Sequence, residues 1–141
     1  MIFIRTLAAL ALAAAASAAW AGAADDAQRH LRAIAANNVD ALAQDYAEGA
    51  VMQWVGGPLN GVYVGNVQLR DLWTRLAKAQ GVLELAIAQV EENTNPIGAT
   101  VTSNARFRGN AQTKVRHVLV YRDAKIVAEV WQIDPAMAFA N

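Results

Sequence analysis

The fold is decided by residues 114–134, which read KVRHVLVYRDAKIVAEVWQID. Val, Ile and Tyr dominate on either side of Asp123-Ala124, so the segment predicts a β-hairpin with strands over 114–122 and 125–134. In the first strand, one set of alternating residues carries three cations, and the other places His117 between Val115 and Leu119. Because successive side chains point to opposite faces, we expect the cations outward and His117 inward.

Upstream of the hairpin, the chain alternates between helical and extended patterns. Apolar residues spaced by three and four predict helices over 25–36, 40–49 and 66–79. Asp25 or Asp26 caps the first helix, and Gly49 and Gly81 end the other two. Short strands are expected over 50–55, 82–91 and 99–108, with turns at 56–61, 93–98 and 109–110. Helices followed by strands indicate an α+β domain, in which the helices cover one face of an antiparallel sheet.

The first 24 residues have the three parts of a secretory signal peptide. Arg5 precedes an unbroken run of Leu and Ala, and small residues between Ala16 and Ala23 then match the cleavage pattern A-x-A three times. We therefore expect removal of residues 1–24, with cleavage near 18–24, and a periplasmic or secreted protein that does not contact a membrane afterwards. The alternative is an N-terminal membrane anchor, although the apolar run is too short to cross roughly 30 Å of hydrocarbon.

The remaining ~118 residues are enough for one domain, over 25–134, followed by a flexible tail, 135–141. Removal of Arg5 leaves 11 bases against 12 acids, a formal charge of −1, which does not favour nucleic-acid binding. The chain has no Cys, so thiol chemistry and Cys–Zn sites are excluded.

Three stretches carry a family resemblance: Tyr46-Ala-Glu-Gly-Ala-Val51, Gly61-Val-Tyr-Val-Gly65 ahead of a helix, and the hairpin around Asp123. Their order and spacing resemble the NTF2-like superfamily, especially its SnoaL-like and ketosteroid isomerase branches. The resemblance implies a cone-shaped α+β barrel with three N-terminal helices packed on a curved antiparallel sheet. It also implies a homodimer joined through the outer sheet face. It does not imply one activity, because this fold carries isomerases, hydrolases, dehydratases and non-catalytic binders.

The resemblance also implies catalytic positions. His30 matches the tyrosine with which steroid isomerases donate to the substrate oxygen, and His117 matches the protonated aspartate that assists it. Trp54 occupies the position of the general-base aspartate, and Trp131 that of the acid in limonene epoxide hydrolases. Glu129 lies two residues before Trp131 and therefore faces the same side of the strand. In an apolar pocket we expect its pKa to be raised, so that it can act as an acid or a base.

The candidate catalytic residues are thus His30, His117 and Glu129. The candidate ligand-binding residues are Tyr46, Trp54, Trp73, Ser103 and Trp131. Each has a plain structural alternative: His30 on the surface, His117 as a core histidine, Glu129 paired with an arginine across the hairpin, and the tryptophans as ordinary core. The spacing of the histidines matches no metal motif, so we expect no metal and no cofactor.

Three functions remain open. The first is an exported domain that binds a small hydrophobic molecule in an aromatic-lined pocket and acts as an isomerase, lyase or hydrolase. The second is a non-catalytic carrier with the same pocket. The third is a dimeric interaction domain whose interior is filled by its own side chains.

Overall fold

A computed structural model describes residue 20 and residues 22–140. Most of the predicted signal peptide, residues 1–19 and 21, therefore lies outside the described residues. Three helices and six strands follow one another in the order α1 (Ala23–Ala35), α2 (Val39–Asp45), β1 (Tyr46–Val55), β2 (Gly61–Val64), α3 (Gly65–Gln80), β3 (Glu84–Asn95), β4 (Gly98–Arg108), β5 (Gln112–Arg122) and β6 (Lys125–Ile133). None of these helices is long and apolar enough to cross a membrane.

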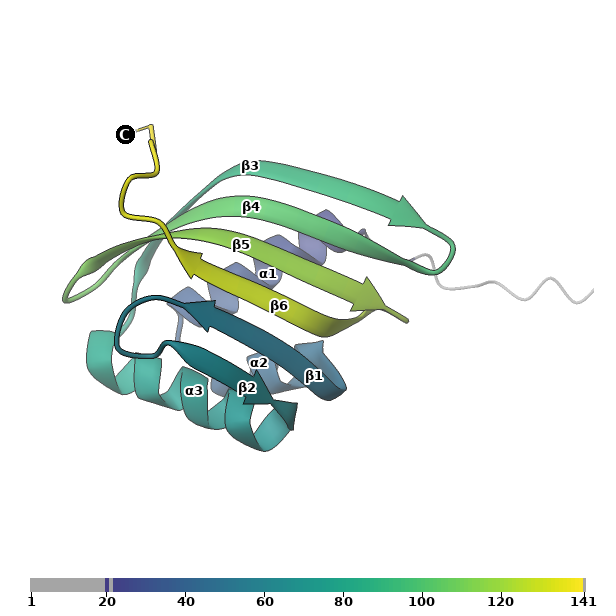
Figure 1. The fold of residues 1–141 in the computed structure, drawn as a ribbon, viewed down its shortest axis with the longest axis horizontal. Coiled ribbons are helices and arrows are strands. Elements are labelled where there is room, and N and C mark those ends of the chain that lie inside the picture. The colour runs from purple at the N-terminus through teal and green to yellow at the C-terminus, as the bar shows by residue number, and fades with distance from the viewer. Residues whose placement is uncertain (1–19, 21, 141) are drawn as a thin grey trace, which may run out of the picture.

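The strands form one curved sheet with the spatial order β2-β1-β6-β5-β4-β3 (Figure 1). The hairpin β5–β6 forms its centre and turns at Asp123 and Ala124, both of which have positive φ. Helix α1 packs against β3 and β4, while α3 packs against β1 and β2. The α+β class is therefore confirmed, with the helices on the concave side of the sheet.

Three details of the predicted architecture are corrected by the structure. The sheet is open rather than a closed barrel, because its edge strands β2 and β3 do not pair with each other. They pack instead against α3 and α1. Only α1 and α2 precede the sheet, since α3 follows β1 and β2. The sheet is also not wholly antiparallel: β1 runs parallel to β6. That pairing joins the first strand to the last across a long connection, as parallel neighbours require.

The segment around Tyr46 differs most from the sequence prediction. Helix α2 ends at Asp45, and Tyr46 already has extended backbone angles, so β1 begins four residues earlier than predicted. Gly49, predicted to end the helix, has a φ of 71° inside β1, where the register with β6 shifts between Tyr46 and Val51. A bulge of this kind bends a strand. Here it turns the start of β1, with Tyr46, into the core.

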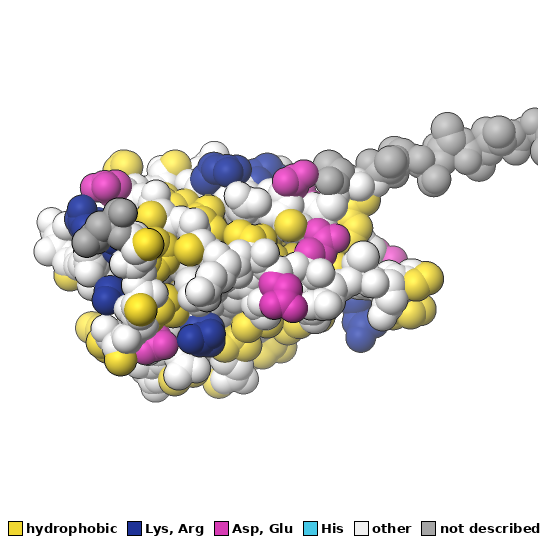
Figure 2. Space-filling view, turned by 90° about the horizontal axis from the view of Figure 1, so that it is seen from above, with side chains coloured by type: hydrophobic (Ala, Val, Ile, Leu, Met, Phe, Trp, Pro, Cys, Tyr) yellow, Lys and Arg dark blue, Asp and Glu magenta, His cyan; other side chains and the backbone are white. Residues whose placement is uncertain are grey.

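The interior holds most of the aromatic side chains of the described residues, although Trp20 is exposed, as are several large aliphatic side chains such as Val67 and Val82. Tyr46, Trp54, Trp73, Phe107 and Trp131 are all buried in one apolar cluster with residues of α1 and α3. On the face seen in Figure 2, acidic and basic side chains are interspersed and no histidine is visible. This agrees with the burial of both histidines. At the C-terminal end, Met137 is buried, and Lys114 Nζ donates to its carbonyl oxygen at 2.9 Å.

Candidate functional site

All three candidate catalytic side chains meet inside the domain. His30 from α1, His117 from β5 and Glu129 from β6 are each at most 1 % exposed. The alternating pattern of β5 correctly places His117 inward, opposite its three outward cations. The carboxylate of Glu129 lies between the two histidines: its Oε1 is 2.7 Å from His117 Nε2, and its Oε2 is 3.4 Å from His30 Nε2.

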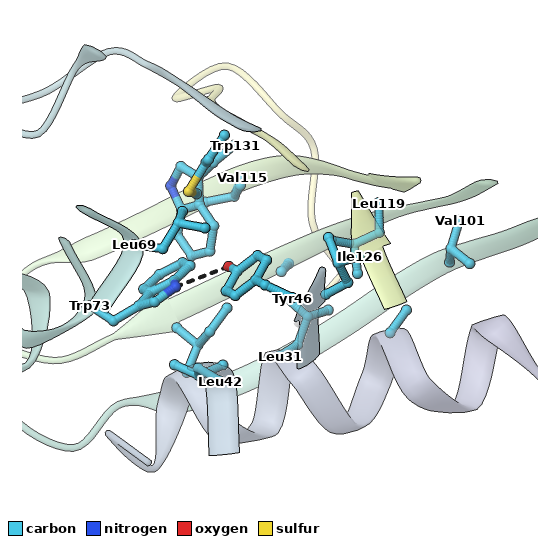
Figure 3. Close-up of a cluster of buried hydrophobic side chains, with 14 of the residues drawn as sticks. Leu31, Leu42, Tyr46, Leu69, Trp73, Val101, Val115, Leu119, Ile126 and Trp131 are labelled. Carbon is cyan, nitrogen blue, oxygen red and sulfur yellow. Dashed lines mark hydrogen bonds between the residues drawn. The ribbon is translucent and has the colours of Figure 1, made fainter. Parts of the chain in front are cut away.

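Tyr46 and Trp73 extend this buried hydrogen-bonded cluster toward α3. The Tyr46 hydroxyl donates to Glu129 Oε2 in a short hydrogen bond. It accepts a hydrogen bond from Trp73 Nε1 at 3.0 Å, drawn as the dashed line in Figure 3. A carboxylate only accepts hydrogen bonds, so His117 must carry a proton on Nε2, the atom that faces Glu129. The three side chains Tyr46, His30 and His117 thus direct protons at one carboxylate.

Asp45 connects the cluster to the surface, and the sequence analysis missed it. Its Oδ2 lies 2.9 Å from His30 Nδ1, and its Oδ1 accepts from Arg29 Nη1 at 2.9 Å. The side chain is 10 % exposed, whereas that of His30 is fully buried. The available signal was the spacing of three between Leu42 and Asp45, which places both on one helix face. His30 therefore has a carboxylate at each ring nitrogen.

These contacts determine the protonation states. Burial disfavours charge on His30, but the negative charge of Glu129 and the hydrogen bond to Asp45 outweigh it and raise the pKa of His30 to about 9. Burial likewise acts to raise the pKa of Glu129, yet the charge of His30 and the hydrogen bond from His117 hold that pKa well below its ordinary value. Burial and the neighbouring carboxylate raise the pKa of Tyr46. The expectation of a raised pKa for Glu129 is therefore wrong, because its surroundings are cationic rather than apolar.

A separate apolar pocket of about 140 Å³ lies on the other side of the tryptophans. Its walls come from β1 and β6, from the loop before β2, from α3 and the segment after it, and from the end of the β4–β5 hairpin: Trp54, Pro58, Leu59, Leu76, Ala79, Gln80, Leu83, Phe107, Ala111, Thr113, Trp131 and Ile133. Of the predicted site residues, only Trp54 and Trp131 line it. The cluster around Glu129 does not reach it.

Trp131 stands between the two regions. Its ring stacks on Trp54 with centroids 4.6 Å apart and on Phe107 at 5.0 Å. It also meets His117 with ring centroids 5.8 Å apart and Trp73 at 5.6 Å, both in edge-to-face arrangements. The Trp131 indole therefore contacts both the apolar pocket and the residues of the buried hydrogen-bonded cluster.

Ser103, the last predicted ligand-binding residue, joins neither region. It pairs with His117 across β4 and β5 and is buried, but its Oγ has no hydrogen-bond partner among the described residues. Within residue 20 and residues 22–140, no group of three or more His, Asp or Glu side chains could hold a metal ion.

Comparison with known proteins identifies the family. The family model described as SnoaL-like domain matches residues 27–129, which include Trp54 on strand β1 and end at Glu129, two residues before Trp131. The chain belongs to the SnoaL-like family. The NTF2-like resemblance of the sequence is thereby confirmed. A search of the curated proteins finds no match.

Solved structures show the fold that this SnoaL-like domain shares. A ketosteroid isomerase-like protein from Erwinia carotovora atroseptica is 16 % identical, with a TM-score of 0.63 over 77 % of this chain and 91 % of that one. An NTF2-like protein of unknown function from Pseudomonas putida is 16 % identical, with a TM-score of 0.65 over 75 % and 80 %. A putative calcium/calmodulin dependent protein kinase II association domain from Xanthomonas campestris is 17 % identical, with a TM-score of 0.67 over 81 % and 86 %. At these identities the likeness concerns the fold alone.

Proposed function

We propose that this SnoaL-like domain binds a small, flat, apolar molecule in the pocket beside Trp54 and Trp131. The observation that carries the proposal is the stacked indole wall, since flat aromatic surfaces favour flat ligands. Leu59, Leu76 and Leu83 also line the pocket and supply apolar contacts. A cavity of about 150 Å³ can hold one benzene-sized ring, so the pocket suits a single-ring ligand.

The test is a titration of the ¹⁵N-labelled domain with acetophenone, followed through the indole N–H resonances. Saturable shifts at Trp54 and Trp131 support the proposal. Ala79→Phe places a ring at the pocket wall and should abolish the shifts. Ala136→Phe adds the same ring to an exposed residue outside the pocket and should leave them intact. Absence of any saturable shift in the unmodified domain, or equal binding by both variants, contradicts the proposal.

A second candidate function is catalysis, favoured by the charged cluster one indole behind the pocket. Buried groups with strongly shifted pKa values are common at active sites. Glu129 would accept a proton and His30 would donate one, in an isomerase, lyase or hydrolase reaction on a substrate that enters as Trp131 moves aside. Under this hypothesis Glu129→Gln abolishes turnover. Under the carrier hypothesis it leaves ligand affinity within twofold, measured at a temperature at which the variant is folded.

We also propose that the domain is exported and acts as a homodimer. Export rests on the signal pattern of residues 1–24 and implies a periplasmic or secreted protein. The dimer would use the outer sheet face, where Val118 and Val120 lie among the cations of β5. Native mass spectrometry of the exported protein tests both points. A monomer mass, or a chain that retains its first 24 residues, would contradict them.

A further inference from the structure

The wall of the apolar pocket includes two polar side chains, Gln80 and Thr113. Apart from these two and the two indoles, the described residues that line the pocket have apolar side chains. Gln80 and Thr113 are half-buried, whereas Trp54, Phe107 and Trp131 are buried. The three aromatic rings therefore form the floor of the pocket, and the two polar side chains lie nearer to solvent.

A hydrogen bond fixes the orientation of the Gln80 amide. Its Oε1 accepts from the backbone N–H of Ala111 at 3.1 Å, and Ala111 also lines the pocket. The oxygen must face this donor, so the other end of the same planar group is the NH₂, which offers two N–H donors. Gln80 Nε2 has no hydrogen-bond partner among the described residues. The amide thus carries unused donors at the wall where the end of α3 meets the β4–β5 turn.

Thr113 lies two residues beyond Ala111, on the same face of the chain. Its strand turns it inward together with the buried Val115. A threonine hydroxyl is attached directly to Cβ, so in a side chain that lines the pocket it cannot lie far from the wall. Because Gln80 is bonded to Ala111, its amide and the Thr113 hydroxyl are neighbours on one side of the pocket.

Both polar groups are open to a ligand. Three unpaired polar atoms of the described residues are fully enclosed: Ser103 Oγ, Tyr121 OH and Trp131 Nε1. Neither Gln80 Nε2 nor Thr113 Oγ1 is among them, and neither has a hydrogen-bond partner in the described part of the chain. Each group therefore has a free hydrogen-bonding position that water or a ligand can reach.

We infer that Gln80 and Thr113 bind a hydrogen-bond acceptor of the ligand, an inference that rests on the proposed binding function. A carbonyl oxygen has two lone pairs and can accept from the amide and the hydroxyl. No charged side chain of the described residues lines the pocket, and burial of an ionised ligand group without a counter-charge is strongly unfavourable. The ligand class is then a neutral single-ring molecule whose ring lies on the tryptophans and whose carbonyl group faces Gln80 and Thr113.

Acetophenone and α-methylstyrene test the inference, because they have nearly the same shape and differ in a C=O against a C=CH₂ group. The readout is the ratio of their dissociation constants. Thr113→Val keeps the shape and removes the hydroxyl, so it should shift the ratio about fivefold toward the hydrocarbon, as loss of one neutral hydrogen bond predicts. Thr113→Ser retains a hydroxyl and should keep the ratio. Thr102→Val, the same change at an exposed position of β4 outside this pocket, is the matched control and should also leave it unchanged.

A second measurement needs no variant. In the unmodified domain, acetophenone should move the side-chain NH₂ resonances of Gln80 further downfield than α-methylstyrene does, because only the ketone accepts a hydrogen bond. Equal effects of the two probes on these resonances, or the same ratio in Thr113→Val as in the unmodified domain, overturn the inference while the binding function stands. If neither probe binds the unmodified domain, the proposed function fails and the inference fails with it.

Discussion

Replacement of Glu129 by Gln should destabilise the domain substantially even though the two side chains have the same shape. The carboxylate accepts from Tyr46 OH and from His117 Nε2 at 2.7 Å, and it lies 3.4 Å from His30 Nε2. The amide has only one acceptor oxygen. Its NH₂ group would face the donors that now point at the second carboxylate oxygen, so the cluster loses hydrogen bonds and His30 loses a buried counter-charge.

The size of the effect follows from the contacts that are lost. Removal of one partner of a buried ion pair costs ~3–5 kcal/mol. Gln leaves no cavity, and Asp45 remains 2.9 Å from His30 as a second counter-charge, so the lower end applies. We therefore expect a loss of ~3 kcal/mol, from a total stability of ~5–15 kcal/mol for a domain of this size. The midpoint temperature Tm should fall by on the order of 10 °C.

The assay is urea unfolding at pH 7, followed by tryptophan fluorescence, together with an NMR titration of the His30 ring. The pKa of His30, raised to about 9 mainly by the charge of Glu129 against the opposing effect of burial, should fall in the variant. Glu48→Gln, at an exposed position of β1, is the control and should change stability by less than ~0.5 kcal/mol. Equal stability of Glu129→Gln and the unmodified domain, or an unchanged titration of His30, would refute the assignment of an ionised Glu129 beside a cationic His30.

Four further changes, two of pH and two of single residues, have expected effects on stability. Because the pKa of His30 rises from 6.5 to about 9 on folding, its contribution is complete below about pH 6.5 and is lost as the pH rises through about 9. Urea midpoints should fall over this window, and a flat profile would contradict the charge assignment. Conversely, the lowered pKa of Glu129 gives stability that is present above about pH 4.5 and declines as the pH falls, which circular dichroism in acid can measure. Gly98→Ala should prevent correct pairing of β4 with β5, since a Cβ there would lie 2.2 Å from the backbone oxygen of Tyr121; a native-like thermal melt of that variant would show the contact to be adjustable. Trp131→Ala should cost ~3–5 kcal/mol by emptying the space beside Trp54, whereas an unchanged Tm would count against a filled core.

The local sequence pattern predicted the structure correctly wherever a helix or strand has one buried face. The alternation in β5 correctly placed His117 inward, and the apolar spacing in α3 found a helix whose observed bounds, Gly65–Gln80, lie within one residue of the prediction. It failed where a short segment depends on a distant partner. Strand β2 has only four residues, and its extended form rests on pairing with β1. Tyr46 continues a helical spacing, but the pairing of β1 with β6 holds it in a strand.

The candidate site could likewise be predicted from the sequence only in part. Its residue types and inward faces could be read from the sequence, and His30, His117, Glu129 and Tyr46 do meet in the interior. Asp45 was missed because its contact with His30 depends on the approach of α2 to α1, and its spacing from Leu42 shows only which face of α2 it shares. The pKa of Glu129 was expected in the wrong direction, because its burial was foreseen but its direct contacts with the two histidines were not.

The sequence by itself determined the α+β class, the central hairpin and which side chains turn inward, because these depend on periodicities of two and 3.6 residues within single elements. The superfamily was indicated separately, by the resemblance carried by three stretches of the sequence. Only the tertiary structure decided that the sheet stays open, that β1 runs parallel to β6, and that Trp131 stands between a charged cluster and an apolar pocket. Those features arise from contacts between residues far apart in the chain. The distances between those residues, a few ångströms each, decide whether Glu129 is ionised and which side chains line the pocket.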